Sequence, residues 1–295
     1  MTTQTTPKVE AGLSDTAFAK IAALAKAEAG LILPASKVTM VQSRLRHRLA
    51  ALGLTSYEAY SKFVGGDEGA SERRHMISAL TTNVSHFFRE NHHFDILRTQ
   101  ALPALLQKAR SGQPVRIWSA GCSSGQEPYS IAMLILEAAP DLQNLDTLIL
   151  ATDIDPKILE KAESGIYSDH QITGVPSGMR GKYLKSDGAN FSVTPAVRRM
   201  IRFRELNLLR DWPMRTQFDV IFCRNVVIYF DTETQDRLWP RFQQALKPDG
   251  WFFLGHSERV SEASASRFTS VGMTAYRPTT ALGHEAAKTH QAKEA

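Results

Sequence analysis

The sequence predicts an α/β protein in which a mainly parallel sheet follows a small all-helical domain. Between residues 14 and 82 no run has strand character, and apolar residues recur at helical spacing. From residue 113 onward, short apolar runs alternate with helical patterns, which is typical of a parallel sheet covered on both faces. We therefore expect domains over residues 14–82 and 113–277, joined by a linker and connecting helix over residues 83–112.

Composition excludes several classes of protein. Hydrophobic content is 43% and charged content 22%, as in ordinary globular proteins, and the net charge of +5 is too mild to predict nucleic-acid binding. No apolar run reaches about 18 residues and the first residues are polar, so we expect neither membrane insertion nor a signal peptide. Cys122 and Cys223 form no C-x-x-C pair, which is typical of reduced thiols in a cytoplasmic protein. We expect disorder over residues 1–12 and 278–295.

The all-helical domain begins with Ser14 as the expected N-cap of a helix that Gly30 ends. A longer helix is expected over residues 35–52, and two short helices near residues 56–64 and 68–81.

The helix over residues 35–52 carries unbalanced positive charge, because Arg44, Arg46 and Arg48 lie on it and no acidic residue occurs from residue 29 to residue 57. Arg44 and Arg48 are four residues apart, so they share a face and find no neutralising partner within the helix. Two interpretations stay open: a solvated face, or a docking surface for an acidic partner.

The linker reads TTNVSHFFR over residues 81–89. Its aromatic pair either packs the linker on the next domain or accompanies a site at the seam between domains, lined by Asn83, Ser85 and Arg89. The adjacent His92 and His93 point in different directions on a helix and have no carboxylate cluster nearby, so we expect no metal site. One long helix is expected over residues 90–110.

The first sheet unit is VRIWSAGCSSGQEPYSI, residues 115–131, which reads as strand, glycine-containing turn and helix. Gly121 and Gly125 let a ligand approach the backbone next to a helix N-terminus. They do not form G-x-G-x-x-G, so tight packing remains the alternative to a nucleotide site.

The second strand is expected over residues 147–153. Asp155 reads as the N-cap and Pro156 as the first residue of the following helix. That leaves Asp153 free at the edge of the sheet, where an acid is placed to bind both hydroxyls of a ribose; a second capping group is the alternative.

Residues 166–203 interrupt the α/β repeat with a polar, irregular insertion and a hairpin expected around Asp187 and Gly188. Further strands are expected over residues 201–206, 218–223, 251–254 and 273–276, and a helix begins after Asp231. Asp153, Asn207 and Asn225 all follow strands, so they meet at the sheet edge where α/β proteins bind ligands.

Five motifs in order resemble the chemotaxis receptor methyltransferases of the CheR type: ALTTNVSHFFRE, SAGCSSGQEPYSIA, ATDID, FDVIFCRNVVIYFD and LKPDGWFFLGHSE. The resemblance covers residues 14–277. It implies an S-adenosylmethionine-binding, Rossmann-like domain with a seven-stranded mixed sheet, an antiparallel last strand and an inserted β-subdomain near residues 166–203. It also implies methyl transfer to glutamates on the cytoplasmic methylation helices of chemoreceptors, with S-adenosylhomocysteine as the second product.

The resemblance also implies the site. The family's cofactor contacts fall on Asn83, Ser85, Arg89, Gly121, Glu127, Asp153, Asn207, Leu208, Asn225 and Val226. Its active-site tyrosine matches Tyr229. Within this scheme Asp153 holds the ribose, Glu127 contacts the methionine amino group, and Arg89 orients a carboxylate. Arg44, Arg46 and Arg48 would meet glutamate-rich receptor helices.

The hairpin around Asp187 and Gly188 is shorter than in relatives that grip a receptor C-terminal peptide, so we expect recognition without that tether. We also expect a monomer. Three alternatives remain. An NAD-dependent oxidoreductase would need a G-x-G-x-x-G motif, which this turn does not provide. The others are a non-catalytic cofactor-binding or interaction module, and a methyltransferase for a different acceptor such as RNA, for which the sequence has no large basic run.

Overall fold

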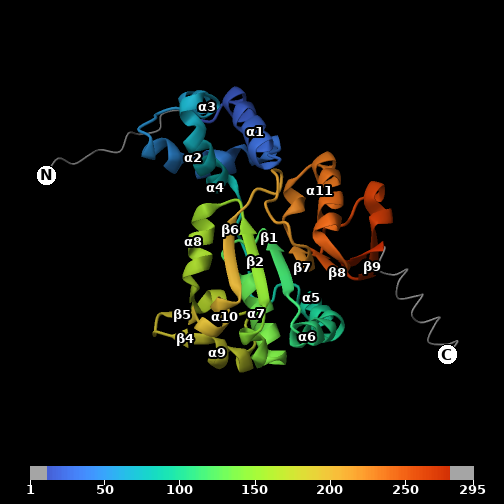
Figure 1. The fold of residues 1–295 in the computed structure, drawn as a ribbon. Coiled ribbons are helices and arrows are strands. Elements are labelled where there is room, and N and C mark those ends of the chain that lie inside the picture. The colour runs from blue at the N-terminus through green and yellow to red at the C-terminus, as the bar shows by residue number, and fades with distance from the viewer. Residues whose placement is uncertain (1–11, 280–295) are drawn as a thin grey trace. The chain divides into compact units, whose positions relative to one another are not determined.

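The structure is a computed structural model that describes residues 12–279. The expected disordered tails therefore lie outside the described residues, apart from their innermost positions. The described chain divides into two compact units (Figure 1): residues 12–82 with Tyr229–Asp231, and residues 83–228 with residues 232–279. Among the described residues, no helix is long and apolar enough to cross a membrane.

The first unit is helical, as predicted. It contains α1 (Asp15–Ala29), α2 (Val38–Ala51), α3 (Tyr57–Gly65) and α4 (Ala70–Leu80), with 3-10 turns at Ala35–Lys37 and Asp67–Gly69. Ser14 caps α1 as expected, since its Oγ accepts a hydrogen bond from the Ala17 amide at 3.3 Å, and Gly30 ends it with φ of 68°. Val41, Leu45 and Leu49 form the buried apolar stripe of α2, whereas Val38 and Leu52, which we also expected to be buried, are half-buried and exposed respectively.

The second unit is built on a seven-stranded sheet of order β6-β2-β1-β7-β8-β10-β9 (Figure 1). The strands are β1 (Val115–Ala120), β2 (Thr147–Asp153), β6 (Ile201–Glu205), β7 (Phe218–Cys223), β8 (Leu246–Leu254), β9 (Phe268–Gly272) and β10 (Ala275–Pro278). Strands β6, β2, β1, β7 and β8 pair in parallel, whereas β10 runs antiparallel to both β8 and β9. The mixed sheet with an antiparallel end is therefore confirmed.

The bounds of the last expected strand were wrong. The last strand begins at Ala275 rather than residue 273, because Met273 and Thr274 form the turn from β9, with Thr274 at φ of 52°. The sequence did not predict β9 as a separate strand. Pairing with β9 extends β10 through Pro278, one residue beyond the expected end of the domain at residue 277.

The helices of the second unit follow the predicted α/β alternation. They are α5 (Asn91–Ile96), α6 (Leu102–Arg110), α7 (Gln126–Ala138), α8 (Pro156–Ser164), α9 (Ser177–Tyr183), α10 (Pro195–Arg199) and α11 (Thr232–Ala245), with 3-10 turns at Pro140–Asn144, Asp169–Ile172 and Glu262–Arg267. A further 3-10 turn, Val227–Tyr229, ends on a residue of the first unit. The single helix expected over residues 90–110 is interrupted by a π-helical turn at Leu97–Ala101. Pro103 has no amide hydrogen to continue the α-helical ladder, which accounts for the change of register.

A small three-stranded sheet, β3-β5-β4, forms the insertion. Its strands are β3 (Ile166–Ser168), β4 (Leu184–Ser186) and β5 (Asn190–Val193), and β4 pairs antiparallel with β5. The hairpin predicted around Asp187 and Gly188 is thus confirmed, with Gly188 at φ of 95°. The Asp187 side chain accepts hydrogen bonds from the amides of Ala189 and Asn190, which closes the turn.

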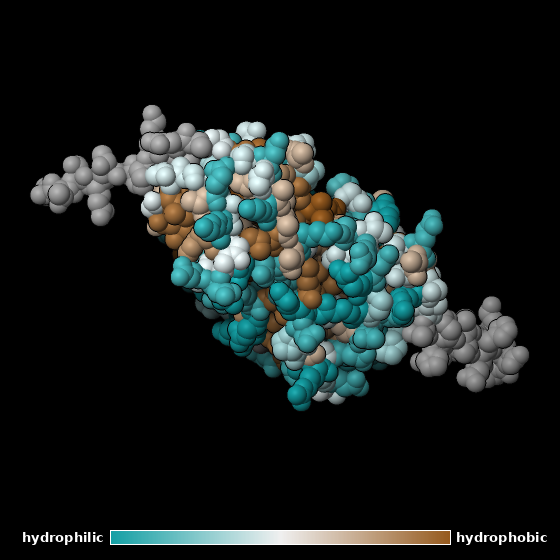
Figure 2. All heavy atoms as spheres, turned by 90° about the horizontal axis from the view of Figure 1, so that it is seen from above, coloured by the Kyte–Doolittle hydropathy of each residue, from teal (hydrophilic) through white to brown (hydrophobic). Residues whose placement is uncertain are grey.

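One face of the molecule is largely hydrophilic (Figure 2). On the face drawn in Figure 2, polar and charged side chains cover most of the area and hydrophobic residues show between them. The large apolar side chains exposed among the described residues are Ile32, Leu52, Val84, Ile166, Ile228 and Met273.

Candidate functional site

The predicted cofactor residues of the second unit gather around the carboxyl ends of β1, β2 and β7, three adjacent strands. Gly121 lies in the turn after β1 and Glu127 in the first turn of α7, which follows it. Asp153 is the last residue of β2, and Asn225 follows β7. Parallel strands deliver these side chains to one edge of the sheet, where ligands of open α/β sheets bind.

The glycine turn is packed against protein on the side where a Cβ would stand, which gives its glycines a structural role beside the predicted ligand role. Gly121 has φ of 80°, and a Cβ at this position would lie 2.3 Å from Val226 Cγ2. Gly125 has φ of 92°, and its Cβ would lie 3.0 Å from both Ala162 Cβ and the Tyr167 hydroxyl. Both positions therefore require glycine for backbone conformation and internal packing.

The linker segment is fastened to this turn. Ser123 Oγ donates to the Asn83 carbonyl at 2.8 Å, and Asn83 Nδ2 donates to Asp155 Oδ2 at 3.0 Å. Further along, the Phe88 amide donates to Ser130 Oγ of α7 at 2.9 Å. Within the second unit, the segment that contains Asn83 and Arg89 thus lies beside the residues of the sheet edge.

Backbone strain concentrates in the same loops. Five non-glycine residues of the described chain have positive φ: Phe88, Glu90, Ser123, Asn225 and Thr274. The first two flank Arg89, Ser123 lies in the glycine turn, and Asn225 follows β7. Such conformations cost free energy and persist where surrounding contacts enforce them, which is frequent at functional sites.

Arg224 organises the charges of the site, and the sequence interpretation did not single it out. Its side chain is buried at 2% exposure, with Nη1 at 3.1 Å from Glu127 Oε2 and Nη2 at 3.1 Å from Glu90 Oε2. Nη2 also donates to the Arg89 carbonyl. The sequence hints at this role only because Arg224 directly follows the apolar strand β7. A charge buried at the end of such a strand requires partners of opposite charge or hydrogen-bond acceptors.

The pKa values of the two acids beside Arg224 are shifted in opposite directions. Burial raises the pKa of Glu127 despite the Arg224 guanidinium and a 2.7 Å hydrogen bond from Ser119 Oγ. For Glu90, burial also acts to raise the pKa, but the charge and hydrogen bonds of Arg224, with that of Asn225, outweigh it and lower the pKa to about 2. Glu90 is therefore a fixed negative charge at neutral pH.

The Asp153 carboxylate, which we expected to be free for a ligand, already accepts hydrogen bonds from the backbone. Its Oδ2 accepts a hydrogen bond from the Ser123 amide at 2.8 Å, and its Oδ1 accepts one from the Asp155 amide at 3.0 Å. Each carboxylate oxygen has a second lone pair, so the group can still accept from two hydroxyls. Asp155 fulfils its predicted capping role by accepting from the Lys157 amide. Burial raises the pKa of Asp153 to about 6, more than its backbone hydrogen bonds lower it.

The remaining residues predicted to contact the cofactor or the substrate differ in burial and in the unit to which they belong. Ser85, Arg89 and Val226 are half-buried, and Arg89 Nη1 donates to the Val84 carbonyl at 3.3 Å. Asn207 Oδ1 accepts from the Leu209 amide, and Leu208 is buried. Tyr229 belongs to the first unit, where its carbonyl accepts from the Ile32 amide at 3.0 Å.

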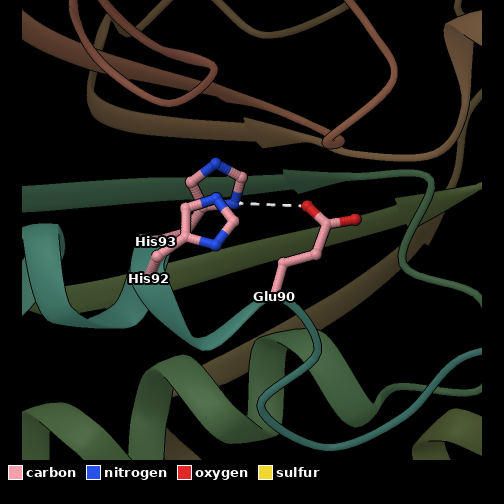
Figure 3. A group of neighbouring side chains, drawn as sticks. All are labelled: Glu90, His92 and His93. Atoms are coloured by element: carbon pink, nitrogen blue, oxygen red, sulfur yellow. Dashed lines mark ion pairs between the residues drawn. The ribbon is translucent and has the colours of Figure 1, made fainter.

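Glu90, His92 and His93 form a further cluster (Figure 3), with one potential ligand atom from each within 4.8 Å of the others. The carboxylate absent from the sequence interpretation is Glu90, whose side chain points toward His93. His93 Nε2 lies 2.9 Å from the Met273 carbonyl, which only accepts, so this nitrogen carries the proton. Burial lowers the pKa of His93 to about 3. Arg224 already supplies positive charge to Glu90, which disfavours a metal cation there.

The three arginines of α2 are not equivalent. Arg48 forms a two-fold hydrogen bond with Glu72 of α4, at 2.8 and 2.6 Å, and Glu72 is 3% exposed. Arg44 Nη1 donates to the carbonyls of Leu80 and Thr81 at the end of α4. Both side chains therefore hold the helical unit together, whereas Arg46 is exposed.

Comparisons with known proteins agree with this architecture. Residues 16–81 match the family model described as CheR methyltransferase, all-alpha domain, and residues 83–277 match CheR methyltransferase, SAM binding domain. The chain is 48% identical over 264 residues to a probable chemotaxis protein methyltransferase of Rhizobium etli, covering 88% of this chain and 98% of the relative. It is 42% identical to chemotaxis protein methyltransferase 2 of Pseudomonas aeruginosa (84% and 88% covered), and 40% identical to the chemotaxis protein methyltransferase of Escherichia coli (90% and 91% covered).

Proposed function

The chain belongs to the CheR family of S-adenosylmethionine-dependent chemotaxis methyltransferases, and from this premise we propose that it methylates glutamate side chains of chemoreceptors. The product is a glutamate γ-methyl ester, and the acceptors are glutamates on the cytoplasmic methylation helices. The observation that supports the proposed site best is the meeting of Glu127, Asp153 and Asn225 at the carboxyl edge of the sheet, beside the strained segment around Arg89.

The residues present fit the cofactor. Asp153 keeps lone pairs for two ribose hydroxyls, and Glu127 provides a buried carboxylate for the methionine ammonium group. Arg224 screens part of the negative charge of Glu127 without removing it, because the same guanidinium is shared with Glu90. When bound, the cofactor supplies a methyl group already activated on a sulfonium.

The protein's part in the reaction is positioning. A glutamate carboxylate, with an ordinary pKa of about 4.3, is ionised at neutral pH and is already nucleophilic, so no general base is required. Alignment of such a nucleophile lowers a reaction barrier by about 7–11 kcal/mol in favourable cases. In this scheme Arg89 orients a carboxylate and Tyr229 lines the transfer site.

The decisive experiment is methyl transfer from labelled S-adenosylmethionine to isolated receptor signalling domains. We expect labelled protein that releases methanol in mild base, as a carboxyl ester does. Label stable to base would contradict glutamate esterification, and label on RNA in place of receptor would favour a different acceptor. Omitting the receptor is the control.

Two variants test the assigned roles. Asp153→Ala should weaken S-adenosylmethionine binding in calorimetry, and unchanged affinity would remove the ribose assignment. Tyr229→Phe should lower turnover if the hydroxyl acts at the transfer site; full turnover would leave a role only for the ring.

We also propose that receptor recognition does not depend on a C-terminal peptide tether. The short β4–β5 hairpin, closed by Asp187, supports this proposal because it offers strands of only three and four residues. Titration with a receptor C-terminal pentapeptide should show no tight binding, and a stoichiometric calorimetric transition would refute the proposal.

A further inference from the structure

Glu258 is a buried acid with no assigned role, in the loop that follows β8. Its residue is 3% exposed, and its carboxylate accepts hydrogen bonds from four backbone amides. Oε1 accepts from Val226 at 2.8 Å and Ile228 at 3.2 Å, while Oε2 accepts from Asn225 at 2.8 Å and Gly255 at 2.6 Å. The loops after β7 and β8 are therefore joined through one side chain.

The four hydrogen bonds define what Glu258 can do. A carboxylate offers about four lone-pair positions, and all of them are occupied by protein amides. Glu258 is consequently unable to accept a further bond from a ligand, so it is not a catalytic or cofactor-contacting group. Its effect must pass through the backbone that it holds.

That backbone is the part of the site that needs support. Asn225 has φ of 58°, a left-handed conformation that asparagine tolerates better than most non-glycine residues and that neighbouring hydrogen bonds hold in place. Asn225 Nδ2 also donates to Glu90 Oε1 at 3.3 Å, which connects the loop to the residue next to Arg89. Val226 fills the space that the missing side chain of Gly121 leaves. A shift of this loop would therefore disturb the glycine turn and the Arg89 segment together.

The two loops pack closely at Gly255. A Cβ at Gly255 would lie 2.6 Å from Asn225 Nδ2, 2.8 Å from the Asn225 amide nitrogen and 2.8 Å from Glu258 Oε2. The Glu258 amide in turn donates to the Gly255 carbonyl at 2.9 Å, which closes a tight turn around the carboxylate.

We propose that Glu258 is a positioning residue of the cofactor site, whose carboxylate holds the backbone of Asn225 and Val226 in the conformation that binds S-adenosylmethionine. The inference rests on the proposed function, since that function assigns Asn225 and Val226 to the cofactor. A loop ordered before binding loses less conformational entropy when the cofactor arrives, so removing the carboxylate weakens affinity.

The test compares Glu258→Gln with Glu262→Gln, a matched change at an exposed glutamate four residues further on. Glutamine keeps the size of glutamate, but its NH₂ group replaces one carboxylate oxygen. That group is a donor, so it cannot accept the hydrogen bonds of the two backbone amides that this oxygen accepts from. Thermal unfolding is recorded first, and S-adenosylhomocysteine affinity is then measured by calorimetry well below the unfolding temperature of each variant. We expect Glu258→Gln to bind about ten- to a hundredfold more weakly, the usual effect of losing hydrogen bonds to a charged group, and Glu262→Gln to bind normally.

A purely structural role predicts a different pattern. Glu258→Gln would then unfold at a lower temperature but bind S-adenosylhomocysteine as tightly as Glu262→Gln while folded, and this result would overturn the proposal. Glu258→Asp keeps the charge with a shorter reach, and it should recover part of the affinity. Failure of the unaltered protein to bind S-adenosylhomocysteine would instead count against the proposed cofactor site itself.

A measurement on the unaltered protein covers the case in which no Glu258 variant folds. The amide protons of Asn225 and Val226, which donate to the carboxylate, are followed by NMR during titration with S-adenosylhomocysteine. We expect both signals to move on binding, with a distant amide such as that of Gly112 unchanged. Stationary signals from Asn225 and Val226 would show that the loop held by Glu258 does not respond to the cofactor.

Discussion

Arg224 Nη1 lies 3.1 Å from Glu127 Oε2, and this pair joins the loop after β7 to the first turn of α7 inside the protein. The same guanidinium reaches Glu90 and the Arg89 carbonyl, so one buried cation connects three segments of the site. A buried charge that loses its partner is costly, whereas an exposed pair contributes little.

Replacing this cation should therefore destabilise the fold. Arg224→Gln leaves Glu127 and Glu90 without their counter-charge, and we expect a loss of about 3–5 kcal/mol in the free energy of unfolding measured with urea. Arg237→Gln is the control, because its pair with Glu233 is exposed and should contribute at most about 1 kcal/mol. Equal losses in the two variants would contradict the organising role of Arg224.

The lowered pKa of Glu90 predicts how stability depends on pH. The folded-state pKa of about 2 lies below the ordinary value of 4.5, so the ionised group stabilises the fold above the unfolded value and this contribution is lost as pH falls toward 2. The unfolding free energy of the unaltered protein minus that of Glu90→Gln should be constant above about pH 5 and shrink at lower pH. A difference that grows with acidification would reverse the assignment.

The raised pKa of Asp153 predicts how cofactor affinity depends on pH. With a pKa of about 6 in the free protein, the carboxylate that would accept the ribose hydroxyls becomes protonated as pH falls below that value. Affinity for S-adenosylhomocysteine should therefore be constant above pH 7 and weaken by about tenfold per pH unit well below 6. Calorimetry from pH 5 to 8 checks this, and Asp153→Asn should bind weakly throughout and reduce the dependence to the part that comes from Glu127, whose pKa is also raised by burial.

Gly121 allows backbone strain and side-chain contact to be separated. Gly121→Ala combines a strained φ with a 2.3 Å approach to Val226 Cγ2, whereas Gly112→Ala has a comparable φ of 82° and no atom within 4 Å. We expect Gly112→Ala to cost about 1–2 kcal/mol in unfolding free energy. Gly121→Ala should cost more and should also weaken cofactor binding, because Val226 must move. Similar results for the two variants would mean that Val226 relocates freely.

Receptor docking is best tested at Arg46. Charge reversal at Arg44 or Arg48 would remove hydrogen bonds to α4, whereas Arg46 is exposed on α2 and interacts with the Tyr57 side chain. Arg46→Glu should raise the receptor KM by several-fold, more strongly at low salt, and leave S-adenosylhomocysteine affinity unchanged. Lys20→Glu on α1 is the control, because it changes the net charge by the same amount at an exposed residue outside α2. The same rise in KM for both variants would indicate net charge, not α2, as the cause.

Much of the fold was predictable because its signals are local. The cap at Ser14, the Asp155 and Pro156 start of α8 and the Asp187 hairpin each depend on contacts within a few residues, and the apolar strands follow from burial on both faces of the sheet. Five ordered motifs were enough to identify the family and its cofactor. The sequence alone therefore determined most of the parallel strands, the helical part that precedes the sheet and the class of chemistry, but not β9 or the π-helical turn at Leu97–Ala101.

Only the tertiary structure decided which of these polar residues are partners. Arg224 meets Glu90 from 134 positions away, Arg48 meets Glu72 of another helix, and Glu258 holds amides of the loop after β7. It also showed that Gly121 makes room for Val226, and that two of the three arginines on α2 are occupied within the helical unit. A spacing rule describes neighbours along one helix or strand, but the partner of a buried charge depends on which distant segment packs against it.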